Sequence, residues 1–121
     1  MLTHVLLAWV WIQENGCAAP LSNSFIDAVY SATAALVNAD SVVTDLELEA
    51  AAFLYLAGQD TRVDDAFVER VIATQRSDGG WLQSSDSSGE SGWHPTILGL
   101  FILLHEEYRA ESYPPMLAPA S

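Results

Sequence analysis

The amino-acid sequence predicts an all-α fold of about five helices, arranged as a partial α/α toroid or as stacked helical hairpins. Helical segments that are apolar on every side alternate with amphipathic segments along the chain. An all-round apolar helix must be covered on every side, and amphipathic neighbours supply such cover. No segment shows the two-residue alternation of a half-buried strand.

The first two helices are expected at about residues 2–13 and 24–38. Residues 5–12 are apolar, and Gly16 and Pro20 break the helix that contains them. This run lacks a preceding positive charge and is shorter than the roughly 20 residues that span a bilayer, so we expect a core helix rather than a signal or a membrane span. The apolar stripe of the second helix comprises Phe25, Ile26, Val29, Thr33, Leu36 and Val37.

The third helix carries the clearest start signal. Thr44 and Glu47 form a capping box, in which each side chain reaches the other residue's backbone amide. Residues 50–57 carry no charge, so we expect this helix to be buried nearly all round. Gly58 then offers a left-handed stop.

The fourth helix is expected to begin near Asp64 or Asp65. Its apolar stripe comprises Phe67, Val68, Val71 and Ile72, and the residues expected to face water are Glu69, Arg70 and Arg76.

The fifth helix is expected to place Pro95 at its first position, where no amide donor is needed. Residues 96–104 are apolar on every side. Residues 1–110 are therefore expected to form one helical-repeat domain, followed by a proline-rich tail over residues 111–121.

The composition excludes several classes of partner. The 121 residues include sixteen acids, four arginines and no lysine, for a net charge of −12. Such a chain repels phosphate backbones and anionic lipid, so we expect no nucleic-acid partner. The single cysteine, Cys17, leaves no internal disulfide, which fits a cytoplasmic location.

The segment from Gln75 to Trp81, "QRSDGGW", predicts a structured turn between the fourth and fifth helices. Two glycines permit backbone angles closed to other residues, and Asp78 can accept hydrogen bonds from turn amides. Trp81 can pin the turn against the helix ends, and Gln75 can bond backbone groups of a neighbouring helix. The structural turn motif comprises Gln75, Asp78, Gly79, Gly80, Trp81 and Trp93.

This segment resembles the Gln-x-x-x-Gly-x-Trp repeat of the terpene cyclase and protein prenyltransferase superfamily. The resemblance covers residues 64–105 well and the first half of the chain only by helix alternation. It implies an α/α toroid in which such turns join an outer helix to an inner one. It also implies that five helices leave the ring open, so that apolar faces of the first and fifth helices stay exposed.

The catalytic motifs of that superfamily are absent. The cyclases carry an Asp-x-Asp-Asp acid, but here Arg62 stands two residues before Asp64. The prenyltransferases hold zinc with Asp, Cys and His, and Cys17 belongs to no recognisable zinc motif. We therefore expect no catalytic residue, no metal site and no cofactor.

The histidines and nearby acids have structural interpretations. His94, at the start of the fifth helix, is expected to cap backbone amides, with a ligand contact as the alternative. His105 is expected to favour the negative end of that helix. Glu47 and Glu49 point to different faces of the third helix and are explained by its dipole.

Two functions remain open. The first is a non-catalytic, toroid-like module that binds a protein partner or an apolar ligand, or self-associates, through its apolar helix faces. The alternative is an isoprenoid-acting enzyme, or a fragment of one, which rests on analogy of fold alone.

Overall fold

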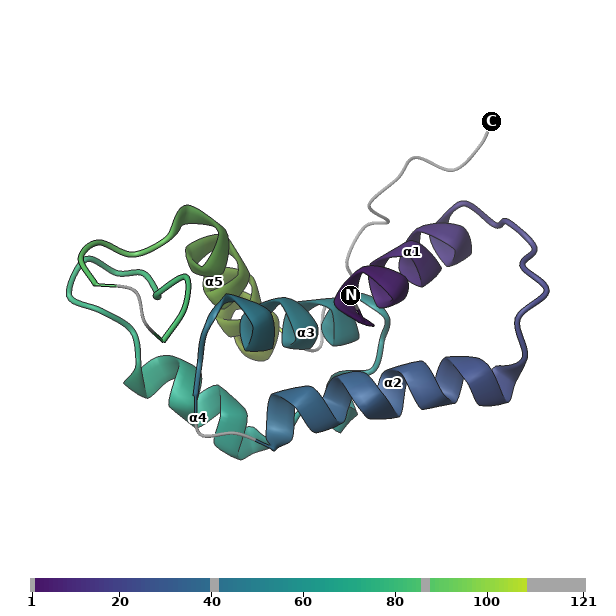
Figure 1. Ribbon diagram of the computed structural model, residues 1–121, viewed down its shortest axis with the longest axis horizontal. Coiled ribbons are helices and arrows are strands. Elements are labelled where there is room, and N and C mark those ends of the chain that lie inside the picture. The colour runs from purple at the N-terminus through teal and green to yellow at the C-terminus, as the bar shows by residue number, and fades with distance from the viewer. Residues whose placement is uncertain (1, 40–41, 86–87, 109–121) are drawn as a thin grey trace.

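The computed structural model describes residues 2–39, 42–85 and 88–108, which form five α-helices and one turn of 3₁₀ helix (Figure 1). Within these ranges no strand occurs, and the only β-type pairing is an isolated antiparallel bridge between Trp81 and Gly92. The all-α prediction is confirmed, and the expected tail over residues 111–121 lies outside the described residues. The elements are α1 (Leu2–Glu14), α2 (Asn23–Asn38), α3 (Asp45–Leu56), η1 (Asp60–Arg62), α4 (Asp65–Ala73) and α5 (Trp93–Glu107).

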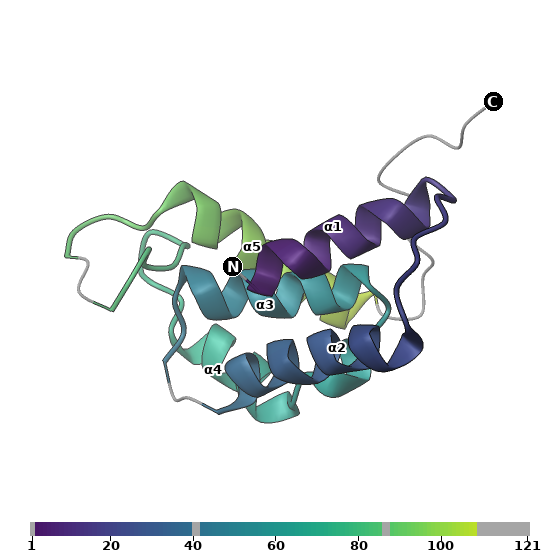
Figure 2. The same cartoon turned by 45° about the vertical axis from the view of Figure 1, so that its right-hand side comes forward.

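Helix α3 lies at the centre of the molecule, with α1, α2 and α5 packed around it (Figures 1 and 2). It begins where the capping box predicts, and the Thr44 amide donates to Glu47 Oε2 at 2.9 Å. Gly58 follows the helix with a φ of +69°. The expected all-round burial is confirmed, because the buried residues of α3 are Leu48, Glu49, Ala50, Ala51, Ala52, Leu54 and Tyr55.

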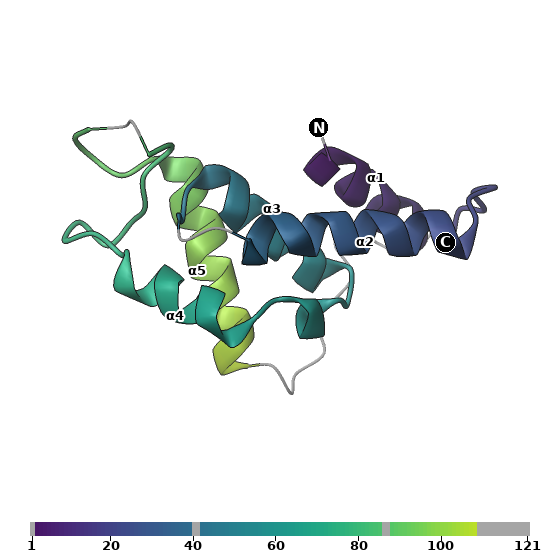
Figure 3. The ribbon, with the colours of Figure 1, turned by 60° about the horizontal axis from the view of Figure 1, so that its bottom comes forward.

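Helix α2 packs against α3 and α1 (Figure 3). It does so along the predicted stripe, apart from the first residue of that stripe. Its buried residues are Ile26, Val29, Thr33 and Val37. Phe25 was expected in this stripe but is 48 % exposed, because it lies one position round the helix from Ile26.

Helix α4 packs beside α5 (Figure 3). Its buried residues are Phe67 and Val71. Ile72, expected in the stripe, is instead 58 % exposed. The expectation that Arg70 and Arg76 face water is also wrong. Arg70 is half-buried over the ring of Phe67, and Arg76 is half-buried and donates to the carbonyl of Gly89. Both guanidinium groups therefore cover apolar or loop surface.

Helices α1 and α5 each bury one face and expose the other. The buried face of α1 contains Leu6 and Val10, while Val5 and Trp11 are exposed. On α5 the buried face contains Leu98 and Ile102. The expected exposure of apolar faces on the first and fifth helices is confirmed. The expectation that every all-round apolar helix is covered on every side holds for α3 and is wrong for α1 and α5, which have amphipathic cover on one face only.

The start of α5 differs from the prediction. The helix begins at Trp93 with Gly92 as its N-cap, so Pro95 occupies the third helical position rather than the first. Proline is tolerated there because the first four amides of a helix have no partner within it.

Candidate functional site

The turn between α4 and α5 is held together by Asp78. One of its carboxylate oxygens accepts from the Ser91 hydroxyl at 2.6 Å and from the Gly80 amide at 3.1 Å, and the other accepts from the Ser91 amide at 3.0 Å. These bonds, the Ser91 hydroxyl first, lower the pKa of Asp78 to about 2. The predicted bonding of turn amides by Asp78 is confirmed, and it joins both ends of the loop.

Trp81 fills the space between α4 and α5. Its side chain is 1 % exposed, and its Nε1 donates to the carbonyl of Val71 at 2.9 Å. Gly99 of α5 lies against the indole, and a Cβ there would come within 2.6 Å of Trp81 Cε3. The predicted pinning role of Trp81 is confirmed.

The two glycines of the turn serve different purposes. Gly79 has a φ of +88°, as the prediction required. Gly80 does not have a positive φ; a Cβ on it would collide with the side chains of Thr96 and Ser91. The second glycine is therefore needed for space rather than for its backbone angle.

Two residues of the predicted turn motif behave differently from the prediction. Gln75 Nε2 donates to the carbonyl of Gly79 at 2.9 Å, so it closes its own turn and does not reach a neighbouring helix. Trp93 is 76 % exposed, and its ring forms a T-shaped pair with that of His94 at a centroid distance of 5.4 Å. Trp93 therefore takes no part in pinning the turn.

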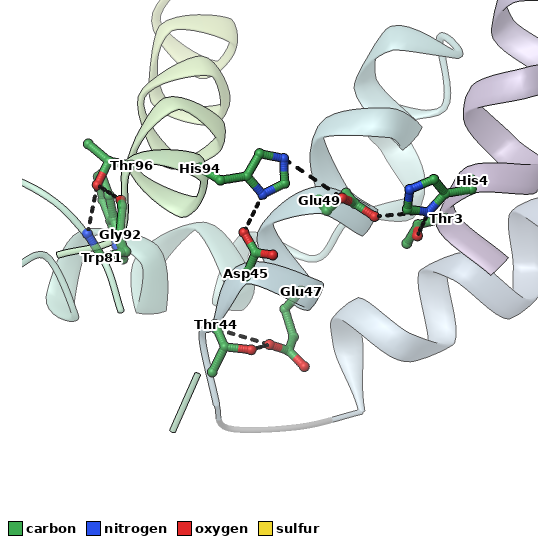
Figure 4. A network of polar contacts seen from close by, with 10 residues as sticks. All are labelled: Thr3, His4, Thr44, Asp45, Glu47, Glu49, Trp81, Gly92, His94 and Thr96. Carbon is green, nitrogen blue, oxygen red and sulfur yellow. Dashed lines mark hydrogen bonds and ion pairs between the residues drawn. The ribbon is translucent and has the colours of Figure 1, made fainter. Parts of the chain in front are cut away.

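Three helices bring a chain of acids and histidines together (Figure 4). His94 Nδ1, on α5, donates to Asp45 Oδ1 at 2.6 Å. His94 Nε2 lies 3.9 Å from Glu49 Oε2, and the other oxygen of Glu49 lies 3.7 Å from His4 Nδ1 on α1. Thr3 Oγ1 contacts the same nitrogen of His4 at 3.3 Å. We call Asp45, His94, Glu49 and His4 the polar chain.

The polar chain corrects the interpretations of His94 and Glu49. His94 contacts carboxylates rather than backbone amides, so it is not the expected amide cap. Glu49 is 8 % exposed and lies between two imidazoles, which the helix dipole does not explain. Asp45 and Glu49 are four residues apart and therefore share one face of α3. That spacing indicated from the sequence that the two acids lie together. It could not indicate their histidine partners, which lie on other helices.

The polar chain consists of one hydrogen bond between an imidazole and a carboxylate and two longer contacts of Glu49 with the two imidazoles. No group of three His, Cys, Asp or Glu residues in the described part of the chain could hold a metal ion. No serine or cysteine belongs to the chain of contacts. Its geometry ties the ends of α1, α3 and α5 together through side chains that carry opposite charges when the imidazoles are protonated.

His105 lies elsewhere, in the last turn of α5 as predicted. The side chain is buried and stacks on the ring of Tyr55 with centroids 4.2 Å apart. It therefore also packs between α5 and α3, a contact that the sequence did not predict.

An apolar groove of about 450 Å³ opens between α1 and α2, beside His4. Val5, Leu21 and Phe25 are each more than 40 % exposed along it. His4 thus belongs both to the polar chain and to the groove. The lining residues are His4, Val5, Ala8, Trp9, Ile12, Leu21, Phe25, Ile26 and Val29.

Comparisons of the chain with family models, with curated proteins and with solved structures gave no match. None of the described helices is long and apolar enough to cross a membrane.

Proposed function

We propose that this protein is a non-catalytic helical module, of α/α-toroid type, that binds an apolar small molecule in the groove between α1 and α2. The observation that carries the proposal is the lining of the groove, in which eight of the nine residues are apolar and the ninth is His4. The toroid assignment is supported by Trp81, which packs between α4 and α5 at the turn that the resemblance singles out. A cytoplasmic location is part of the same proposal and rests on the single cysteine.

The size of the groove favours a small molecule over a partner helix. Its volume of about 450 Å³ falls within the range typical of small-molecule sites. A helix with side chains is roughly 10 Å across and docks along a row of anchors over several turns. The groove offers instead a compact apolar surface with a single polar group at His4.

The lining also defines the chemistry of the ligand. It contains no arginine, so a diphosphate would find no permanent cation there. His4 is held by Glu49 and Thr3 beside the groove and can donate to or accept from one polar group of a ligand. The ligand we propose is therefore a hydrocarbon-bodied molecule with one uncharged polar end, such as an isoprenoid alcohol.

Farnesol binding, followed by calorimetry and by tryptophan fluorescence, tests the proposal. Ala8→Phe fills the groove and is expected to weaken farnesol binding at least tenfold, because it removes about 1.4 kcal/mol or more of binding free energy. Ala66→Phe, at an exposed helical alanine on α4, is the matched control and is expected to leave binding unchanged.

Failure of the wild-type chain to bind farnesol, or equal binding by Ala8→Phe, would refute the groove as the site. Farnesyl diphosphate, with and without magnesium or zinc, tests the enzymatic alternative. We expect no turnover and weaker binding than that of farnesol, and turnover would overturn the non-catalytic assignment.

A further inference from the structure

Helix α5 carries a row of exposed apolar side chains on the face opposite the core. Trp93, Ile97, Leu100 and Leu104 are exposed by 76 %, 60 %, 45 % and 55 %. Their spacing of four, three and four residues is the 3.5-residue repeat of a helix–helix seam. Leu98 and Ile102 point into the core on the other side of the helix. We call the four exposed residues the α5 row.

The α5 row carries no charge, whereas the chain as a whole is strongly acidic. The chain has sixteen acids, yet no Asp, Glu, Lys or Arg occurs between Trp93 and Leu104. Single exposed apolar residues are ordinary, whereas a contiguous uncharged row marks an interaction surface. The α5 row lies outside the α1–α2 groove, so its role is independent of ligand binding.

We propose that the α5 row is the interface of an antiparallel homodimer, in which α5 of one copy packs against α5 of a second copy. A two-fold axis between Ile97 and Leu100 places Ile97 against Leu100 of the second copy and Trp93 against Leu104 of the second copy. This pairing matches a and d positions of opposite helices and covers all four residues of the row.

The area of the row is sufficient for a specific contact. Burying these four side chains removes on the order of 500 Å² per copy, which gives roughly 1,000 Å² in total, the lower limit for a specific interface. The dimer is therefore expected to be weak, with dissociation on the micromolar scale rather than the nanomolar scale.

The charges at the ends of α5 favour the antiparallel arrangement. Glu107 is exposed in the last turn, at the negative end of its own helix dipole, where an acid is unfavourable. The first turn of α5 contains no acid, and its N-cap Gly92 has no side chain to cap the free amides. Antiparallel pairing brings Glu107 toward the positive end of the second copy's α5, whereas parallel pairing brings the acidic ends together.

Sedimentation velocity of the full chain over about 5 to 200 µM tests the dimer. Ile97→Glu is expected to weaken association at least tenfold, because it places a charge in the seam. Ile72→Glu, a substitution of the same chemistry at a similarly exposed isoleucine on α4, is the matched control and is expected to associate like the wild type. A monomeric wild type, or equal loss in both variants, would overturn the proposal. Circular dichroism verifies that both variants stay folded.

Disulfide trapping tests the register. Both variants are made in a Cys17→Ser background. A mixture of Trp93→Cys and Leu104→Cys chains is expected to form a disulfide between the two, whereas Trp93→Cys chains by themselves are expected to form none. Cross-linking of Trp93→Cys with itself would indicate a parallel pair, and the absence of any cross-link would count against the register. Ala8→Phe is expected to leave dimerisation unchanged, which separates this proposal from the ligand site.

Discussion

At the scale of single residues, the two tryptophans that flank the loop between α4 and α5 have opposite environments. Trp81 is buried between two helices and donates to the carbonyl of Val71, whereas Trp93 is exposed on α5. The fold is therefore expected to depend on the first indole and to tolerate loss of the second.

Trp81→Ala is expected to lower the free energy of unfolding by about 3–5 kcal/mol, because it leaves a cavity and removes the hydrogen bond from the indole to the carbonyl of Val71. Trp93→Ala is expected to change it by less than about 0.5 kcal/mol. Urea unfolding at a concentration where the chain is monomeric measures both. Similar losses in the two variants would show that Trp81 does not pin α4 to α5.

The residues of the turn show why part of the site could be predicted from the sequence. The turn at residues 75–81 uses local chemistry, so a positive φ at Gly79 and amide bonding by Asp78 followed from residue type. The need for Gly80 could not be predicted in the same way, because the side chains that exclude a Cβ there, Ser91 and Thr96, lie eleven and sixteen residues away.

At the scale of elements, the connection from α4 to α5 behaves as a closed loop tied by one carboxylate. Because the folded pKa of Asp78, about 2, lies below its ordinary value of 3.8, the ionised form stabilises the fold. This contribution is complete above pH 3.8 and is lost as the pH falls toward 2.

Asp78→Asn removes this titrating group, so its free energy of unfolding is expected to fall less between pH 4 and pH 2 than that of the wild type. Urea unfolding of both proteins at each pH measures the difference. Ser91→Ala removes the hydroxyl donor and is expected to raise the carboxyl pKa toward its ordinary value. NMR titration of the Asp78 carboxyl checks this directly, and titration near 3.8 in the wild type would contradict it.

The helices themselves were largely predictable, whereas their arrangement was not. Burial of α3 followed from the absence of charge between residues 50 and 57. The contact of His94 with Asp45 joins residues 49 positions apart, and no periodic pattern encodes it. The groove likewise depends on how α1 and α2 sit against α3, which is set by tertiary packing.

At the scale of the whole molecule, the net charge of −12 opposes the compact state. The chain has sixteen acids and only four arginines to neutralise them. Two of these arginines already have partners: Arg62 pairs with Asp27 at 2.6 Å, and Arg76 donates to the carbonyl of Gly89. The remaining acids repel one another over distances that salt screens. Repulsion is therefore expected to outweigh ion pairing in the folded monomer.

Raising sodium chloride from about 20 to 300 mM is expected to increase the free energy of unfolding by an amount on the order of 1 kcal/mol. Urea is the suitable denaturant because it adds no ions.

Glu69→Gln, which removes one exposed acid from α4, is expected to be more stable than wild type at low salt, and its stability is expected to increase less when salt is added. The same screening strengthens the α5 dimer, since two chains of like charge must meet, so the unfolding measurements require dilute protein. A free energy of unfolding that falls with salt would show instead that ion pairs such as Arg62–Asp27 and the polar chain outweigh the repulsion.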